Sequence, residues 1–396
     1  MILFGGTTTN GGVNFPGLFH AWGQQVIAGI GWELISRCVE EAGTSMPDFT
    51  DYDRPHWQLQ IRVDRFLFSA LCDEMLVDAG VTILFHVMLA GLEQEEDGSW
   101  KVLVCTKTGL EELKAAVIID TTGDANAAAI ADLPLRYHEN NQPATLAYEV
   151  SGYDLDTLDL EAINAAFDAE VKAGNLKYTD ASWNAAAPDV GRWLRQKGVQ
   201  SNHIYHEAAH DSAGKSLLEL ESRRSLLRMY RFLRKQPGLE NLKIEGFAPE
   251  CGVRETVTIR GRVTVTVEDY TSGRVWEDAL CYAFYPIDLH KFSDEGLDCK
   301  PLTVGTVPTV PRRALIPEGS RNFLIAGRCI SSDRLANSAL RVQSTAMATG
   351  QAAGVVAALA ASTGSDPADV PMPAVRQMLR DHGAIVPNTP SNGAID

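Results

Sequence analysis

Three glycine-containing segments of the sequence have the composition of turns that hold the phosphates of a dinucleotide. Two of them, IIDTTGD at 118–124 and LIAGRC at 324–329, follow apolar runs typical of buried strands, and GQAAG lies farther on at 350–354. Glycine lets a backbone approach a cofactor closely, and a helix that follows offers amide donors and a positive dipole end to an anion. One such unit alone would also suit an ordinary crossover turn. The three together, in this order, favour a cofactor-binding edge.

A second group of residues has side chains that transfer protons or bind anions. Oxidation of an organic substrate needs an acid or base and, for an anionic substrate, a cation. The candidates are His20, His203, His290, Arg254 and Arg341. Each histidine would equally suit a hydrogen-bonded position at a domain interface, and Arg254 would suit an ion pair with Glu255 or Asp288.

The segment HEAAH at 206–210 has the spacing of a zinc hydrolase motif. In such a motif two imidazoles one helical turn apart bind the metal, and the glutamate activates water. Glu219 or Glu221 would be the third ligand. However, the preceding residues 202–206 have a strand-like composition and 211–214 that of a turn, so we expect no metal and keep a zinc hydrolase only as a lesser alternative.

A helix followed by three strands is expected before the first glycine turn. Residues 63–79 have apolar residues at helical spacing after Asp64, a plausible cap, and Gly80 would end that helix. Three strands are then expected, at 81–87, 100–106 and 115–119, and the third leads through the glycine turn into an Ala-rich helix.

The sequence changes character between residues 146 and 304. Helix-like stretches are expected at 154–173 and 215–236, and strand-like ones at 255–267 and 279–285. The remaining residues return to the earlier style. There, 322–328 is predicted to be a strand with a glycine turn, and 342–359 a helix of small residues.

Four motifs in order resemble those of the FAD-dependent oxidoreductase family with a glutathione-reductase-like flavin fold. They cover almost the whole chain and are GGTTTNGG at 5–12, IDTTGD at 119–124, GVRET at 252–256, and AGRCIS at 326–331 continued by LRV at 340–342 and GQAAG at 350–354. The resemblance implies FAD as cofactor and an N-terminal loop, a second turn and a late helix that surround it. It also favours His290 as the acid–base residue, because the family shares the preceding segment YPIDL at 285–289.

The resemblance assigns each of these segments to a part of the flavin. Beside the pyrophosphate and ring it places Gly5, Gly6, Thr7, Thr8, Thr9, Gly11 and Gly12. Near the adenosine half it places Val87, Thr122, Gly123 and Asp124. By the pyrophosphate, the ribityl chain and the isoalloxazine it places Gly327, Arg328, Arg341, Val342, Ser344, Thr345, Gly350, Gln351 and Ala352. Catalytic roles would fall to His290, Arg254 and Arg341.

The sequence departs from the family at its start. Members open with a strand, a G-x-G-x-x-G turn and a helix, whereas only four residues precede Gly5. Without that turn the pyrophosphate would lack its principal amide cradle. We expect an N-terminally truncated chain, and the alternative is a flavin-less binding or partner subunit that has lost the dinucleotide motif.

The fold class expected is therefore α/β, a truncated FAD/NAD(P)-binding (glutathione-reductase-like, Rossmann-like) domain with an inserted mixed-sheet α+β substrate domain. Its divisions would be 1–145 and 305–396 for the FAD-binding domain and 146–304 for the substrate domain. The expected activity is a dehydrogenase that moves hydride from a small organic substrate to flavin N5, and then electrons to an unidentified acceptor.

Composition limits the other function classes. A net charge of -16 would repel nucleic acid. The longest apolar stretch, 346–361, contains Gln351 and is interpreted as a buried helix rather than a membrane span. The start shows no secretory signal and the seven cysteines form no C-x-x-C pair, so a cytoplasmic protein with reduced thiols is expected. A homo-oligomer stays open.

Overall fold

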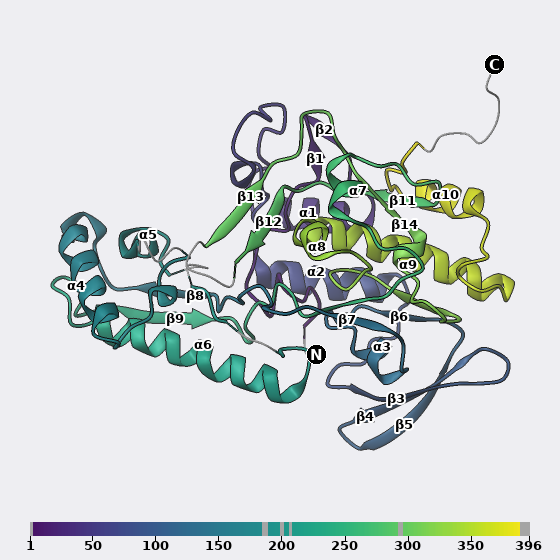
Figure 1. Cartoon of the computed structure of the whole chain (residues 1–396), viewed down its shortest axis with the longest axis horizontal. Coiled ribbons are helices and arrows are strands. Elements are labelled where there is room, and N and C mark those ends of the chain that lie inside the picture. Colours follow the sequence, from purple (N-terminus) through teal and green to yellow (C-terminus); the bar gives the residue numbers. More distant parts are fainter. Residues whose placement is uncertain (1–2, 184–188, 199–201, 206–207, 292–295, 389–396) are drawn as a thin grey trace.

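The computed structural model describes residues 3–183, 189–198, 202–205, 208–291 and 296–388. Figure 1 shows an elongated molecule in which helices α4, α5 and α6 lie at one end and helices α9 and α10 lie at the other. Two separate apolar cores correspond to these ends.

Two short parallel strands form the centre of the larger end. Strand β6 (Ile118–Asp120) pairs with β15 (Phe323–Ile325), which comes about two hundred residues later along the chain. Both are apolar, and β15 is fully buried, as expected of parallel strands covered on both faces. Each strand ends in a predicted glycine turn, and β6 leads into the short helix α3 (Asn126–Ile130). The expected strand and turn at each place are confirmed.

Helix α9 (Gln343–Thr363) packs beside these strands as the long core helix of this end. Its small residues allow close approach, and more than half of it is buried inside the protein. By length and composition alone α9 passes the test for a membrane span, but its burial is that of a core helix. The helix begins one residue later and ends four residues later than the expected range 342–359, and Gly364 caps it in the left-handed conformation.

Helix α2 (Arg65–Asp78) confirms the helix expected at 63–79. Asp64 caps it, accepting hydrogen bonds from the backbone N–H groups of Phe66 and Leu67. It packs against α1 (Ile30–Glu41).

The strand expected at 81–87 is absent from the described residues, and that prediction was wrong. Its apolar alternation is typical of a strand, but no described strand pairs with it, and Leu84 and Phe85 are 55% and 36% exposed. An unpaired backbone gains no ladder hydrogen bonds, so the segment runs as a loop. The sheet begins instead at β3 (Met88–Gln94), which pairs with β4 (Trp100–Thr106).

Strand β5 (Gly109–Ala115) completes this antiparallel sheet, in a segment between the strands expected at 100–106 and 115–119 where no strand was expected. It lies at an exposed edge, where its charged residues are suited to the solvent. The β3–β5 sheet projects from the lower side of the larger end in Figure 1.

The smaller end is built on an antiparallel pair, β8 (Tyr148–Ser151) and β9 (Lys243–Phe247). Helices cover it: α4 (Leu160–Lys172), α5 (Val190–Arg195) and the long α6 (Ser212–Leu233). The two helices expected at 154–173 and 215–236 are confirmed, each displaced by a few residues.

Short antiparallel pairs and helices make up the remaining described elements. These are β1 (His20–Ala21) with β2 (Gln24–Gln25), β7 (Leu135–Tyr137) with β10 (Val257–Ile259), β11 (Ala279–Tyr282) with β14 (Thr309–Pro311), β12 (Ile287–His290) with β13 (Leu297–Lys300), α7 (Val267–Thr271), α8 (Arg334–Leu340) and α10 (Met372–Asp381). The strand expected at 255–267 is thus only three residues long, and α7 follows it.

The apolar cores give a physical division of the chain. The smaller core takes its buried residues from Ala144 to Val253, and the larger core also contains residues between Val257 and Leu302. The sequence-based division at 145 and 304 stays a prediction beside this observation.

Candidate functional site

The turn after β6 is held by one buried carboxylate. Asp120 accepts hydrogen bonds from the backbone N–H and hydroxyl of Thr122, at 2.9 and 2.7 Å, and from the backbone N–H of Ala128 at 3.0 Å. Its carbonyl accepts from the N–H of Ala326 after β15. The Asp120 side chain therefore fixes the turn and the start of α3, and its backbone carbonyl bonds the end of the neighbouring strand.

The two glycine turns are joined by an ion pair. Arg328 donates to Asp124 at 2.6 Å, and Asp124 also accepts from the hydroxyl of Thr256 at 2.8 Å. Gly123 has φ +81°, and a Cβ there would lie 3.1 Å from the guanidinium carbon of Arg328. Glycine is thus required both for the left-handed backbone and for the approach of the arginine.

The N-terminal loop at 5–12 packs on the start of α9. Thr8 donates a short hydrogen bond to the side chain of Gln343, whose amide donates in turn to the carbonyl of Val13 at 2.8 Å. Ser344 donates its backbone N–H to Pro16 at 2.7 Å. Two segments predicted to touch the flavin, far apart in sequence, therefore meet at this helix start.

The hydroxyls of Ser344 and Thr345 in the first turn of α9 have no hydrogen-bond partner among the described residues. Both side chains are fully buried. Gly327 reaches the same helix, because its N–H donates to Thr349 at 3.1 Å. Gly350 faces open space on the helix, with nothing within 4 Å of a Cβ there.

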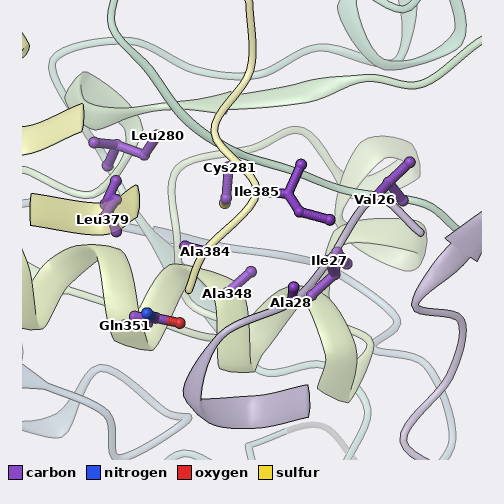
Figure 2. A pocket seen from close by; sticks show the side chains of 10 residues that line it. All are labelled: Val26, Ile27, Ala28, Leu280, Cys281, Ala348, Gln351, Leu379, Ala384 and Ile385. Carbon is purple, nitrogen blue, oxygen red and sulfur yellow. The ribbon is translucent and has the colours of Figure 1, made fainter. Parts of the chain in front are cut away.

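Gln351 follows Ser344 by two turns of α9, and its side chain is engaged by neighbouring backbone. Its amide accepts from the backbone N–H of Ile30 at 3.1 Å and donates to the carbonyl of His382 at 2.9 Å. Figure 2 shows it beside Ala348 and Cys281 around a cavity of about 10 Å³, enough for one water molecule. These contacts connect α1, α9 and the end of α10, and the flavin contact expected for Gln351 stays a prediction.

The other predicted cofactor residues are placed without polar side-chain contacts that would define a role. Val87 lies, half-buried, in the loop before β3, and Ala352 is fully buried in the core. In the N-terminal loop Gly5 and Gly6 are exposed, Thr7 is half-buried, and Gly11 and Gly12 are buried; Thr9 donates to the carbonyl of Phe4 at 2.6 Å. Val342 is the residue before the first turn of α9. Their roles at the flavin stay predictions.

Two histidines that are far apart in the sequence are in direct contact. His203 Nε2 lies 2.8 Å from His290 Nδ1, and His290 Nε2 lies 3.5 Å from a carboxylate oxygen of Asp288. Both imidazoles are buried, and Trp183 stacks on His203 with ring centroids 5.7 Å apart. The three side chains form a line from Asp288 through His290 to His203.

Two arginines lie beside this line. Arg341 donates to the Asp288 carboxylate at 3.2 Å and to Gln142 at 3.3 Å, and Gln142 also accepts from the backbone N–H of His290. Arg254 donates to the carbonyl of Pro143 at 2.7 Å and the hydroxyl of Thr145 at 2.9 Å. The ion pair of Arg254 with Glu255 or Asp288 that the sequence left open is not formed among the described residues, where Glu255 pairs with Arg334 instead.

The electrostatics of this cluster keep both histidines neutral. Burial, with the positive charge of Arg254, lowers the pKa of His290 to about 4 and that of His203 well below 6.5. The hydrogen bond from His290 and the nearby arginines hold the pKa of Asp288 below its usual range, although burial opposes them. Burial and the neighbouring Arg341 lower the pKa of Arg254 to about 10, which still leaves it charged near neutrality.

We call His203, His290, Asp288, Arg254 and Arg341, with Gln142 and Trp183, the histidine–arginine cluster. Sequence reasoning named both histidines and both arginines, and named Asp288 only as a possible partner of Arg254. It missed the contacts of Asp288 with His290 and Arg341, and it missed Gln142 and Trp183. Asp288 precedes His290 by two residues on β12, so the period of a strand places both on one face, a signal that was available. Gln142 and Trp183 carry no sequence signal of their own.

His20 does not join the cluster. It stacks on Phe49 with ring centroids 3.7 Å apart and packs on the edge of Trp32. Burial among these rings lowers its pKa to about 4. It is therefore a core histidine.

The zinc alternative has little support in the described part of the chain. His206 and Glu207 lie outside the described residues, and His210 lies in the turn before α6 rather than on a helix. Glu219 binds Lys215 and Arg223, and Glu221 binds Lys177 and Arg228. Within the residues that the structure describes, no group of three metal-ligating side chains occurs.

The helix start at 341–345 fits the isoalloxazine end of a flavin. Its buried hydroxyls on Ser344 and Thr345 lack partners, and a flavin ring carries carbonyl and ring-nitrogen groups that would supply them. The positive end of a 21-residue helix also suits a ring that gains negative charge on reduction. Arg328 adds a buried Nε without a partner in the described residues, which suits a phosphate.

Comparison with known proteins gives one match of wide extent. A protein-family model described as FAD dependent oxidoreductase matches residues 2–379. No curated protein sequence matches the chain. Among solved structures, OxyS anhydrotetracycline hydroxylase from Streptomyces rimosus is similar at 12% identity and a TM-score of 0.26, over 34% of this chain and 31% of the hydroxylase. The chain thus aligns with less than a third of that protein, and this likeness carries no argument.

Proposed function

The chain belongs to the FAD-dependent oxidoreductase family, and from this premise we propose that it dehydrogenates a small organic substrate bound at the histidine–arginine cluster. It is an oxidoreductase with an α/β flavin-binding fold, and its cofactor is FAD. The flavin-less partner subunit is therefore not the function proposed.

The residues that would hold FAD are those of the two joined turns and the start of α9. Ser344 and Thr345 would hydrogen-bond the ring, and Arg328, fixed by Asp124, would face the pyrophosphate. When bound, FAD supplies a two-electron acceptor that takes hydride at N5.

The cluster lies next to this helix start along the chain. Arg341 caps α8 and precedes Ser344 by only three residues. A Cβ on Gly17 would lie 3.2 Å from the Ser344 hydroxyl and 3.8 Å from the Tyr285 ring, so both side chains lie close to Gly17. A substrate bound by the arginines would thus lie beside the ring position assigned to α9. The histidines would move the substrate proton, and the stacked Trp183 would exclude water.

A single observation carries the proposal: the cluster contains buried polar atoms without partners among the described residues. These atoms are His203 Nδ1, Gln142 Nε2, Arg341 Nε and Trp183 Nε1. Folded proteins rarely leave such atoms unpaired, and a group of them in one place indicates where a ligand supplies the missing partners.

The test is anaerobic reduction of the FAD-loaded protein by a panel of small hydroxy and amino compounds, followed by loss of flavin absorption near ~450 nm. At least one compound should reduce the wild type, and His290→Gln should slow that reduction by about 10²–10⁴-fold. The control His20→Gln changes a half-buried histidine outside the cluster, and this variant should be reduced at the wild-type rate. Equal rates in wild type and His290→Gln would contradict the proposal.

The reoxidising electron acceptor and a second copy of the chain are the partners expected.

A further inference from the structure

The line of hydrogen bonds through the two histidines determines where their protons lie. A carboxylate only accepts hydrogen bonds, so Asp288 selects the form of His290 that carries its proton on Nε2. The opposite form would bring the bare Nε2 lone pair against a carboxylate oxygen at 3.5 Å, which is repulsive. His290 Nδ1 is then an acceptor.

The proton position on His290 in turn determines the proton position on His203. Because His290 Nδ1 accepts, the contact of 2.8 Å requires His203 to donate from Nε2. A neutral imidazole has one proton, so Nδ1 of His203 carries a bare lone pair. This atom is buried and has no hydrogen-bond partner in the described part of the chain.

The charges around this lone pair do not balance. Arg254 and Arg341 are two cations facing one carboxylate, Asp288, while both histidines are neutral. Arg341 bonds Asp288, but within the described residues Arg254 bonds only neutral oxygens, from Pro143 and Thr145. A buried cation without a counter-charge is costly, and an anion bound beside it would offset that cost. Arg254 is also the charged group whose field acts most strongly on His203.

From these observations we infer that His203 Nδ1 is the atom that takes the substrate proton, and that the substrate is a small carboxylate held by Arg254. In this step a substrate O–H or N–H bond breaks, a bond forms from that hydrogen to His203 Nδ1, and the bonding pair stays on the substrate atom. His290 and Asp288 are positioning residues that fix the imidazole and its tautomer. The inference rests on the proposed function for the oxidation that follows, but not for the tautomer or the binding.

The tautomer is tested without flavin, on the full chain labelled with ¹⁵N-histidine, by long-range ¹⁵N–¹H correlation at pH 7. His203→Gln removes one ring from the spectrum and so assigns it. We expect His203 as the Nε2–H form with a bare Nδ1. A proton on Nδ1 of His203 would overturn the inference.

The substrate class is tested by calorimetric titration of the FAD-loaded protein with lactate and with its uncharged amide, lactamide. Lactate should bind at least 10-fold more tightly than lactamide, and Arg254→Gln should remove that difference. Arg312→Gln is the matched control, because among the described residues Arg312 also donates to backbone carbonyls alone, those of Pro367 and Val370. It should leave the difference in affinity intact. Equal affinity for both compounds in the wild type would overturn the carboxylate assignment. Lactate that binds as expected but never reduces the flavin, with no reduction by other compounds, would instead contradict the proposed function.

Discussion

The joined glycine turns and the histidine–arginine cluster use their polar groups in opposite ways. In the turns, the carboxylates of Asp120 and Asp124 accept hydrogen bonds from neighbouring backbone, hydroxyl and guanidinium groups, and among the described residues the unpaired buried atom is Arg328 Nε. In the cluster, His203, Gln142, Arg341 and Trp183 each keep a buried atom unpaired among the described residues. The turns are therefore held mainly by hydrogen bonds that already exist, whereas the cluster gathers polar atoms that still lack partners.

This difference separates stability from function. A change in the turns removes hydrogen bonds that already exist, so it should destabilise the fold. A change in the cluster removes groups that still lack partners, so it should affect binding and proton transfer while the fold remains. Four predictions test this separation.

The largest effect is expected at Asp120. Replacement by alanine leaves the N–H of Ala128 without its acceptor and releases the Thr122 turn, at a cost of about 2–4 kcal/mol in unfolding free energy. Urea unfolding followed by circular dichroism measures it.

Asp97→Ala is the matched control for Asp120. Asp97 makes the same kind of turn contact, to the backbone N–H and hydroxyl of Ser99, but on an exposed hairpin. Its loss should cost less than about 1 kcal/mol. Similar losses of unfolding free energy in both variants would show that the turn after β6 contributes no more to stability than an exposed hairpin turn.

Arg254 should show the reverse behaviour. In Arg254→Gln, carboxylate affinity should fall by about 10–100-fold, as expected for a lost charge-assisted contact, and unfolding free energy should hold or rise because an uncompensated buried cation is gone. Calorimetric titration and urea unfolding on the same sample measure both. If Arg254→Gln has a lower unfolding free energy than the wild type but binds lactate with wild-type affinity, Arg254 has a structural role instead.

His290 should make stability depend on pH. Its folded pKa is lowered to about 4, whereas the unfolded chain binds a proton near 6.5, so the unfolded state holds more protons between these values. Stability should therefore fall as pH falls from 6.5 toward 4, by about 2 kcal/mol between pH 6.5 and 5 from this one group. Asp288, whose pKa is lowered, adds a loss only at lower pH, and His203 adds to the same window as His290.

Unfolding free energies of wild type and His290→Gln across pH 4.5–7.5 check this prediction. The difference in slope should be greatest between about pH 5 and 6.5 and vanish above it. The pKa of Arg254, lowered to about 10, lies above this range, so the positive charge of Arg254 is constant across it. Parallel curves would mean that His290 is not held neutral.

The smallest effect is expected at the start of α9. The double change Ser344→Ala and Thr345→Ala removes hydroxyls without partners in the described residues, so FAD affinity should fall only a few-fold, by about 1 kcal/mol, while stability stays near wild type. Fluorescence titration with FAD measures the affinity. Unchanged FAD affinity would place the ring elsewhere.

Local patterns in the sequence predicted the scaffold better than the cluster. The strands before Gly123 and Gly327, the capped helix after Asp64 and helix α9 all follow from neighbouring residues. The strand expected at 81–87 failed because a strand needs a partner that its own residues do not specify.

The cluster depends on contacts between distant parts of the chain. His203 and His290 are 87 residues apart, and nothing in either neighbourhood indicates the other. Gln351 shows the same limit: its amide connects α1 to the end of α10, a contact between distant segments that its motif did not indicate, while its flavin contact stays a prediction. Residue type and motif therefore identified candidates, and only the packing of the two ends selected among them.

The most direct test of this account is the visible spectrum of the FAD-loaded protein during titration with lactate, in wild type and in Arg254→Gln. A ligand bound at the cluster, beside the start of α9, should perturb or bleach the flavin band near ~450 nm in the wild type. In Arg254→Gln the lactate concentration needed should rise at least 10-fold. Identical titrations in the two proteins would show that the cluster does not bind the substrate, and would contradict the account.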